Sequence, residues 1–213
     1  PGPRLSRVLS LSFDQLHPAV QHHVVNSLGW KSLRPIQEES ISPILAGEDL
    51  LVVGPTAGGK TEAAALPLLS RMAEEEWSGL STLYISPLRA LANDIEMRLG
   101  ELFGLLGRSV AAWHGDVGQS RRKEILREPP DLLVTTPESL EVMLVSTKVD
   151  HRRFFSELQT VVVDEIHSFG SDDRGWHLLP NQIPASVFGP ERMYLPQEIS
   201  FDLTKKTPTM KRP

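Results

Sequence analysis

The spacing of apolar side chains predicts two helices and a strand in the first quarter of the chain. Apolar residues three and four positions apart predict a helix over 12–28, with Gly29 as its C-terminal cap. A second short helix is expected over 36–45. The apolar run at 50–53 stops at Gly54, which is typical of a buried strand.

Short apolar runs alternate with amphipathic segments through the middle of the chain. The predicted strands cover 83–85, 110–113, 132–134 and 161–163, and the predicted helices cover 60–76, 90–103, 118–127 and 138–145. Short β-branched runs alternating with helices favour an α/β fold, with a mostly parallel sheet covered by helices on both faces.

The alternation of short apolar runs with amphipathic segments ends after residue 179. The segment 180–213 carries prolines at a density that excludes long regular elements. These are Pro180, Pro184, Pro190, Pro196, Pro208 and Pro213. The residues 204–213 are basic and polar and are expected to fray.

Composition narrows the class of protein. The 213 residues are 40% apolar, which suits one α/β domain with a real core, and the net charge of −5 argues against a strong general attraction to nucleic acid. A local basic strip stays possible. The absence of cysteine excludes disulfide scaffolds and thiolate metal sites. No apolar run reaches the roughly 18 residues of a membrane span, and the N-terminus lacks a signal-peptide core, so a cytoplasmic protein is expected.

A glycine-rich segment between the run at 50–53 and the helix from residue 60 has the spacing of a phosphate loop. Residues 54–61 fit the pattern G-x-x-x-x-G-K-[ST]. Backbone N–H groups and the helix N-terminus attract phosphate oxygens, the lysine reaches the β- and γ-phosphates, and the threonine hydroxyl can bind Mg²⁺. The alternative is a glycine-rich turn with a chance lysine. The candidate residues are Pro55, Thr56, Ala57, Gly58, Gly59, Lys60 and Thr61.

Two carboxylates follow the last predicted strand. Asp164 and Glu165 come directly after 161–163, at the kind of strand end where ligands bind in open α/β sheets. Asp164 is the candidate Mg²⁺ ligand, and Glu165 is the candidate for polarising an attacking water. His167 could link the phosphate site to a second ligand. The alternative is a solvated acidic strand end with a surface histidine.

Further short motifs occur in a fixed order along the chain. They are Arg34-Pro35-Ile36-Gln37, the phosphate loop, Ser-Pro-Leu-Arg-Ala-Leu-Ala-Asn-Asp at 86–94, Trp-His-Gly-Asp at 113–116, Thr-Thr-Pro-Glu-Ser-Leu at 135–140, Asp-Glu-Ile-His at 164–167 and Asp-Asp-Arg-Gly-Trp at 172–176. Each is weak alone. The ordered set resembles superfamily 2 helicases of the DExH type, in particular the Lhr-like (large helicase-related) group, from about residue 13 to residue 179.

The resemblance implies a RecA-like P-loop NTPase domain that binds ATP and Mg²⁺ and contacts a single nucleic-acid strand, with DNA favoured over RNA. It implies a helical segment with the adenine-reading Q motif over 1–48, the RecA-like domain over 49–179 and a divergent tail over 180–213. The nucleotide would also contact Arg34, Gln37 and Glu62. The nucleic-acid strand would contact Pro87, Arg89, Ala90, Thr136, Pro137 and Glu138.

Several of these residues also have a purely structural interpretation. Gln37 could hydrogen-bond the adenine edge or lie on a helix surface. Arg89 could hold phosphate or pack along its own helix. His114 could be a core or turn histidine as easily as a functional one.

The resemblance is incomplete, because the 213 residues contain neither the Ser-Ala-Thr motif of the family nor a second RecA-like domain with its arginines. Two functions from different classes therefore stay open: half of a helicase motor, or a helicase-derived ATP-binding module without turnover. An unrelated P-loop ATPase is a third alternative. In the family, the Ser-Ala-Thr strand lies between the strands expected at 50–53 and 161–163. The apolar run at 192–195 is the candidate to fill that gap, and a surface anchor for a loose tail is its alternative.

Overall fold

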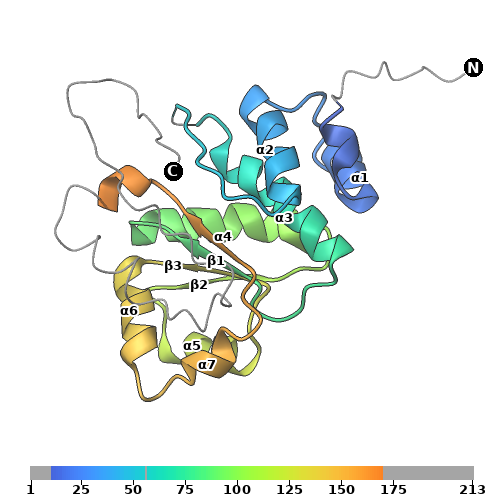
Figure 1. Ribbon diagram of the computed structural model, residues 1–213. Coiled ribbons are helices and arrows are strands. Elements are labelled where there is room, and N and C mark those ends of the chain that lie inside the picture. The colour runs from blue at the N-terminus through green and yellow to red at the C-terminus, as the bar shows by residue number, and fades with distance from the viewer. Residues whose placement is uncertain (1–10, 56, 170–213) are drawn as a thin grey trace, which may run out of the picture.

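The computed structural model describes residues 11–55 and 57–169, with the backbone alone at His167 and Phe169. Its sheet has four parallel strands in the order β2-β3-β1-β4 (Figure 1). The strands are β1 (Thr82–Ile85), β2 (Val110–Trp113), β3 (Leu132–Thr135) and β4 (Thr160–Val163). All four were predicted from the sequence to within one residue.

Helices cover both faces of this sheet, as predicted for the α/β class (Figure 1). One layer holds α3 (Lys60–Glu74) and α4 (Arg89–Gly104), with α1 (Pro18–Asn26) and α2 (Pro35–Leu45) stacked beyond them. The other layer holds α5 (Gln119–Arg127), α6 (Pro137–Val145) and α7 (His151–Phe154). Two short 3₁₀ helices, η1 (Phe13–Gln15) and η2 (Ile166–Phe169), lie at the ends of the described chain.

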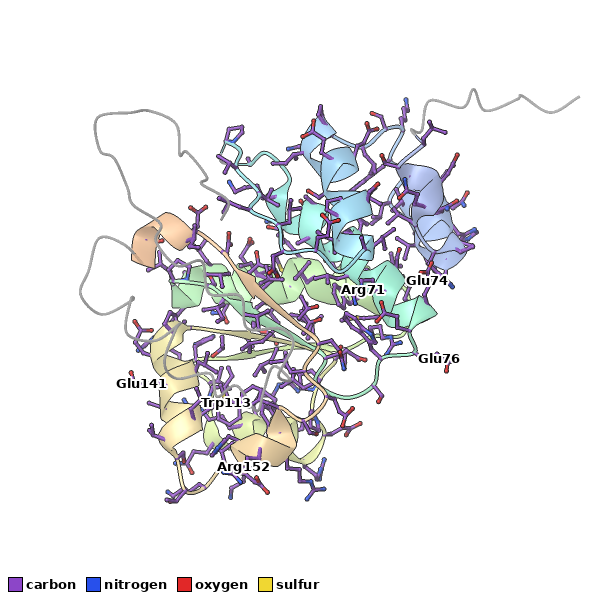
Figure 2. All side chains as sticks on the ribbon, viewed as in Figure 1. Arg71, Glu74, Glu76, Trp113, Glu141 and Arg152 are labelled. Atoms are coloured by element: carbon purple, nitrogen blue, oxygen red, sulfur yellow. The ribbon has the colours of Figure 1, made fainter. Side chains whose placement is uncertain are left out.

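Successive side chains of each strand point to opposite faces of the sheet, so the hydrophobic core has two parts, one on each face. Leu83 and Ile85 face the layer of α5, α6 and α7, whereas Tyr84 faces α3 and α4. Trp113 lies in the α5 layer (Figure 2). Its ring is 6.5 Å from that of Phe154. Residues of α1 and α2 share one apolar cluster with α3 and α4, so the N-terminal helices are built into the domain core.

The prediction of one continuous helix over 12–28 is wrong. The chain forms η1, becomes extended at Leu16 (φ −67°, ψ 150°) and begins α1 at Pro18. Proline cannot donate a backbone hydrogen bond, and it disfavours the helical conformation of the residue before it. His17 instead caps α1, accepting a hydrogen bond from the backbone N–H of Ala19 at its Nδ1 (3.2 Å).

The predicted buried strand at 50–53 is also wrong. This segment has no regular secondary structure, and Leu50, Leu51 and Val53 are 43%, 47% and 74% exposed. Among the described residues, the sheet ends at β4, and no ladder joins β4 to 50–53. An apolar run needs a hydrogen-bonded neighbour to be held as a buried strand. The candidate filling segment 192–195 lies outside the described residues. Two short helices, α7 and η2, were not predicted.

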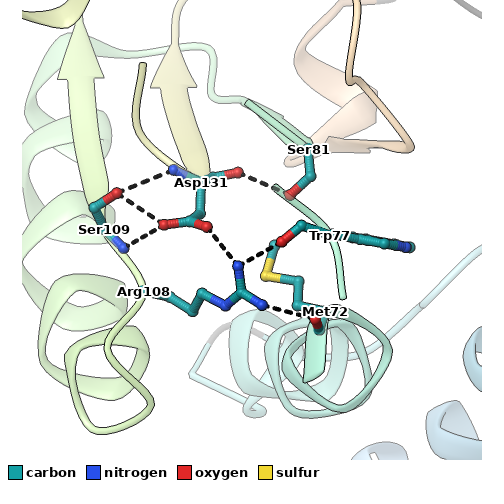
Figure 3. A network of polar contacts seen from close by, with 6 residues as sticks. All are labelled: Met72, Trp77, Ser81, Arg108, Ser109 and Asp131. Carbon is teal, nitrogen blue, oxygen red and sulfur yellow. Dashed lines mark hydrogen bonds and ion pairs between the residues drawn. The ribbon is translucent and has the colours of Figure 1, made fainter. Parts of the chain in front are cut away.

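The amino ends of the strands are joined by a polar network (Figure 3). The Asp131 carboxylate accepts hydrogen bonds from Arg108 (2.8 Å) and from the backbone N–H and the hydroxyl of Ser109 (2.8 and 2.9 Å). Arg108 also donates to the carbonyls of Met72 (2.8 Å) and Trp77 (2.6 Å). This network occupies the amino ends of the strands, and other residues line the carboxyl ends. In the part of the chain that the structure describes, no helix is long and apolar enough to cross a membrane.

Candidate functional site

In the parallel sheet, several of the predicted motifs lie at the carboxyl ends of the strands. Four motifs lie at the carboxyl ends of strands: 86–94 follows β1, 113–116 spans the end of β2, 135–140 spans the end of β3, and 164–167 follows β4. The motif at 172–176 lies outside the described residues. Because β1 lies between β3 and β4, the end of β1 separates the acidic motif from the motif at 135–140. The carboxyl edge of an open α/β sheet is where ligands bind.

A cavity of about 670 Å³ opens at this edge between the start of α3 and the end of β4. It is large enough for a nucleotide, since small-molecule sites measure roughly 300–1,000 Å³. Its walls bring together the phosphate loop, the acidic pair and the Q-motif candidates. The lining residues are Trp30, Ser32, Arg34, Gln37, Ala57, Gly58, Gly59, Lys60, Thr61, Glu62, Leu91, Asp94, Ile95, Arg98, Asp164 and Glu165.

The phosphate loop is tied to the start of α2. The Gln37 side chain accepts a hydrogen bond from the backbone N–H of Arg34 (2.9 Å) and donates to the Gly59 carbonyl (3.4 Å). The Arg34 guanidinium donates to the Ala57 carbonyl. Gly59 has φ +86°, and a Cβ there would lie 2.6 Å from the Gln37 amide nitrogen, so this position requires glycine.

Lys60 lies folded over the loop. Its ammonium donates to the carbonyls of Gly54 (3.1 Å) and Pro55 (3.2 Å). These neutral acceptors bind an ammonium less strongly than charged phosphate oxygens do. Lys60 begins α3, where the unpaired N–H groups and the helix dipole attract anions. The loop is therefore arranged to exchange its internal contacts for an anionic ligand.

The acidic pair lies at the end of β4. The Asp164 backbone N–H donates to the Ile85 carbonyl (2.9 Å), which extends the ladder between β4 and β1 by one residue. The Asp164 carboxylate accepts from the backbone N–H of Glu165 (2.9 Å). Glu165 has φ +48°, a strained conformation for a residue with a side chain. Such strain is concentrated at functional sites.

The oxygen donors at this point fit Mg²⁺. Thr61, in the first turn of α3, and Asp164, directly after β4, both line the cavity, so the two predicted ligands face the same space. Burial, and then the charge of Asp164, raise the pKa of Tyr84 well above its usual value. The described residues contain no group of three or more carboxylates or histidines that could hold a metal by themselves. Mg²⁺ commonly takes one or two protein oxygens and completes its shell with water and phosphate.

Four lining residues of α4 were not predicted. Leu91, Asp94, Ile95 and Arg98 have the i, i+3, i+4, i+7 spacing of one helix face, which could have identified them. Arg98 pairs with Glu62 and with Asp94 (3.5 Å). Partial burial by itself would lower the pKa of Arg98, but hydrogen bonds and charges from Glu62 and Asp94 raise it. Glu62, predicted to contact nucleotide, is thus held by α4.

Trp30 is a further lining residue that sequence reasoning missed. It lies between α1 and α2, is half-buried, and packs against the core shared by α1 to α4. Its indole borders the same cavity as Arg34 and Gln37. A rigid aromatic wall beside hydrogen-bonding side chains suits a planar ligand group such as a nucleobase.

The residues predicted to contact nucleic acid differ in exposure. Arg89 and Ala90 are exposed at the start of α4, and Pro87 is partly buried before it. Arg89 forms an ion pair with Asp116 (2.7 Å) across the turn after β2. In the other predicted contact segment, Thr136 and Pro137 are buried and Glu138 is exposed. The Thr136 hydroxyl donates to Ser139 (3.0 Å).

The structure answers the question left open at His114. Its ring is 3% exposed and lies 2.7 Å from the Asn93 side chain, so it is a buried turn histidine that joins the end of β2 to α4. His167 lies in η2, but its side chain and the whole of Thr56 are outside the described residues. Their predicted roles stay predictions.

Comparison with known proteins agrees with this geometry. Residues 34–183 match the family described as DEAD/DEAH box helicase. The chain is 38% identical over 159 residues to the "Lhr helicase/ probable uracil glycosylase" of Mycolicibacterium smegmatis, covering 68% of this chain and 10% of that protein. It is also 38% identical over 159 residues to the "ATP-dependent helicase Lhr-Core" of Methanothermobacter thermautotrophicus, covering 67% of this chain and 18% of the relative.

Solved structures give the same result. The Mycobacterium smegmatis helicase Lhr bound to ssDNA and AMP-PNP superposes with a TM-score of 0.67 and 32% identity, over 78% of this chain and 22% of that one. The DUF1998 helicase MrfA bound to DNA and AMPPNP gives a TM-score of 0.62 and 25% identity, over 79% and 22%. The 213 residues thus span about a fifth or less of these relatives. On this evidence the chain belongs to the DEAD/DEAH box helicase family, has the RecA-like fold of its N-terminal helicase domain, and has Lhr helicases among its relatives.

Proposed function

We propose that this chain is the ATP- and Mg²⁺-binding RecA-like domain of an Lhr-like helicase, which couples nucleotide binding and hydrolysis to movement along a nucleic-acid strand. The observation that carries the proposal is the cavity in which Lys60, Thr61, Asp164 and Glu165 converge at the carboxyl edge of the sheet. No single element contributes all four residues, so the fold itself assembles the site.

Each residue has a role that follows from its position. Lys60 and the N–H groups at the start of α3 would bind the β- and γ-phosphates. Thr61 and Asp164 would hold Mg²⁺, which when bound neutralises charge on the phosphates. Glu165 would orient the attacking water. Trp30, Arg34 and Gln37 would face the base and ribose end of the nucleotide.

The proposed nucleic-acid strand would cross the ends of β1 and β3. Arg89 is exposed beside the start of α4, where helix N–H groups can hold phosphates without reading bases. The Lhr and MrfA structures that resemble this chain contain DNA, which supports single-stranded DNA as the first ligand to test. With a net charge of −5, binding should be weak and sensitive to salt.

Calorimetric titration with Mg·ATP tests the proposal. We expect Lys60→Ala to weaken binding by roughly tenfold to a hundredfold, since a hydrogen bond to a charged group contributes about 1.5–3 kcal/mol. Lys123→Ala on α5 is the matched control, because it removes an equal charge from an exposed position outside the cavity. Equal ATP affinity of the wild type and Lys60→Ala would refute the assignment of the phosphate loop.

A second candidate function is nucleotide binding without turnover. It is favoured by the exposure of 50–53, the segment that leads into the phosphate loop and does not join the described sheet. The segment before this loop is not fixed by hydrogen bonds to the described sheet. Such a loop can bind phosphate, but it does not position the reacting groups as precisely as hydrolysis requires. ATP binding with no hydrolysis in the presence of single-stranded DNA would favour this second function.

A further inference from the structure

The Arg89 side chain lies flat against a glycine of the turn that follows β2. A Cβ at Gly115 would lie 2.8 Å from Cζ and from one terminal nitrogen of the Arg89 guanidinium, and 3.2 Å from the other terminal nitrogen. Because these three distances are nearly equal, the face of the guanidinium, and not its edge, covers Gly115. Any side chain at position 115 would take the space that Arg89 occupies.

Space, and not backbone conformation, requires glycine at this position. Gly115 is not among the described residues with positive φ, so its backbone suits other residue types. The turn itself is held by two helices. Arg122 of α5 donates to the carbonyls of His114 (2.9 Å) and Gly115 (3.1 Å). The His114 ring lies 2.7 Å from the Asn93 side chain of α4. An added methyl group would therefore displace the exposed end of Arg89 before it moved the turn.

This packing leaves the hydrogen-bonding edge of the guanidinium available. A guanidinium has five N–H donors, and all of them lie in its plane. Contact between its face and Gly115 occupies none of these donors, and one of them pairs with Asp116 (2.7 Å). The Arg89 side chain is 59% exposed, so a ligand in solvent can reach the edge. A planar edge of this kind matches two oxygens of a phosphate.

The stability of α4 does not explain why Arg89 is held in this place. Arg89 is the first residue of α4, and a cation at a helix N-terminus opposes the helix dipole. Its pair with Asp116 is exposed on both sides and contributes little to folding. A fixed cation that stabilises neither the helix nor the fold indicates an anionic ligand.

We propose that Gly115 is a positioning residue for the nucleic-acid strand. Its missing side chain lets the Arg89 guanidinium lie flat on the turn, with the N–H edge presented to a phosphate of the strand. This inference rests on the proposed contact between Arg89 and nucleic acid. It assigns Gly115 itself no contact with the strand, so the effect of Gly115→Ala should vanish once Arg89 is removed.

A double-mutant cycle measured by fluorescence anisotropy tests this, with a fluorescein-labelled oligo(dT) strand at several salt concentrations. We expect Gly115→Ala to weaken binding by roughly fivefold to tenfold at about 50 mM salt, the size of one lost phosphate contact on a single strand. The slope of log affinity against log salt should fall by about 1, as in Arg89→Ala. The double variant should bind no more weakly than Arg89→Ala alone.

Gly118→Ala is the matched control. Gly118 lies in the same loop, has φ −64°, and a Cβ there would meet no atom within 4 Å. This variant should keep the wild-type affinity and salt slope. In Gly115→Ala the affinity for Mg·ATP should stay unchanged, because Gly115 does not line the nucleotide cavity.

The outcomes separate this inference from the proposed function. Wild-type DNA binding by Gly115→Ala, or further loss in the double variant, overturns the role of Gly115 and leaves the contact of Arg89 intact. Loss of Mg·ATP binding in Gly115→Ala also overturns it, because the effect would then come from general destabilisation. Equal DNA affinity of the wild type and Arg89→Ala refutes the proposed contact of Arg89, and the inference with it.

A second measurement does not depend on the folding of Gly115→Ala. In two-dimensional ¹H–¹⁵N spectra, the backbone amide signal of Gly115 should move in Arg89→Ala, since the guanidinium lies against this residue. The signal should also move when oligo(dT) is added to the wild type. The Gly118 signal should keep its position in Arg89→Ala. A Gly115 signal that is unchanged in Arg89→Ala overturns the proposal.

Discussion

At the scale of single residues, the pair Arg89–Asp116 marks where a nucleic-acid phosphate would compete with a protein carboxylate. The two side chains are 59% and 64% exposed and their charged atoms lie 2.7 Å apart. Such an exposed pair contributes only about 0–1 kcal/mol to stability. A phosphate can therefore replace Asp116 at little cost to the fold.

We expect Asp116→Asn to raise affinity for single-stranded DNA by roughly a few fold, because it frees Arg89 and removes a nearby negative charge. Arg89→Ala should weaken binding and reduce the slope of log affinity against log salt by about 1. Fluorescence anisotropy at several salt concentrations measures both, with Glu101→Gln at the far end of α4 as a charge control. Weaker binding by Asp116→Asn would mean that Asp116 orients Arg89 instead.

Tyr84 also predicts how stability changes at high pH. Its pKa is raised in the folded chain, so the unfolded chain loses the phenolic proton first, near its ordinary value of 10.0. The contribution of Tyr84 is fully present below that pH and is lost as the pH rises toward the folded pKa. The free energy of unfolding should fall more steeply above about pH 10 in the wild type than in Tyr84→Phe. Denaturant unfolding checks this, and parallel curves would contradict it.

At the scale of elements, the amino ends and the carboxyl ends of the parallel strands have different roles. Asp131 and Arg108 join the amino ends of β2 and β3 to the end of α3, and their side chains are 16% and 22% exposed (Figure 3). The nucleotide cavity lies at the carboxyl edge. Stability and ligand affinity should therefore respond to different substitutions.

We expect Asp131→Ala to lower the free energy of unfolding by about 2–4 kcal/mol, because it leaves the Arg108 guanidinium and the Ser109 N–H with unpaired donors in a partly buried site. Affinity for ATP should stay unchanged under conditions where the variant is folded. The control is Glu124→Ala, which breaks the exposed pair with Arg121 (48% and 52% exposed) and should cost less than about 1 kcal/mol. Equal costs in the two variants would argue against a structural role for the network.

At the scale of the whole molecule, the described residues that line the cavity include no free arginine for the transition state. Both arginines that line it within the described residues are already engaged, Arg34 with the Ala57 carbonyl and Arg98 with Glu62 and Asp94. An added arginine raises the rate of related phosphate-transfer enzymes by about 10³–10⁵. The 213 residues also span a tenth to a fifth of the relatives that they match.

We therefore expect these 213 residues by themselves to hydrolyse ATP far more slowly than the roughly ten per second of a typical enzyme, with or without single-stranded DNA. A phosphate-release assay measures this rate. Any turnover that remains should disappear in Glu165→Gln, whereas ATP binding should persist, since Glu165 acts on water and not on phosphate. Stimulation by DNA to an ordinary enzymatic rate would contradict the prediction.

The sequence by itself determined the class of the fold and the chemistry of the site. Apolar spacing located β1 to β4 and α2 to α6, because these elements bury faces whose period is visible in the chain. The phosphate loop and the acidic pair were recognisable, because their chemistry requires particular residue types at a fixed local spacing. A family resemblance rested on the same local order and was confirmed.

Tertiary structure alone decided which residues meet. The pairing of Arg98 with Glu62 and the convergence of Thr61 and Asp164 on one cavity join segments that are distant in sequence, and no local pattern specifies such contacts. The run at 50–53 has the composition of a buried strand but does not join the described sheet. The physical reason is that a strand is stabilised by hydrogen bonds to a neighbour, and the sequence of the strand does not contain that neighbour.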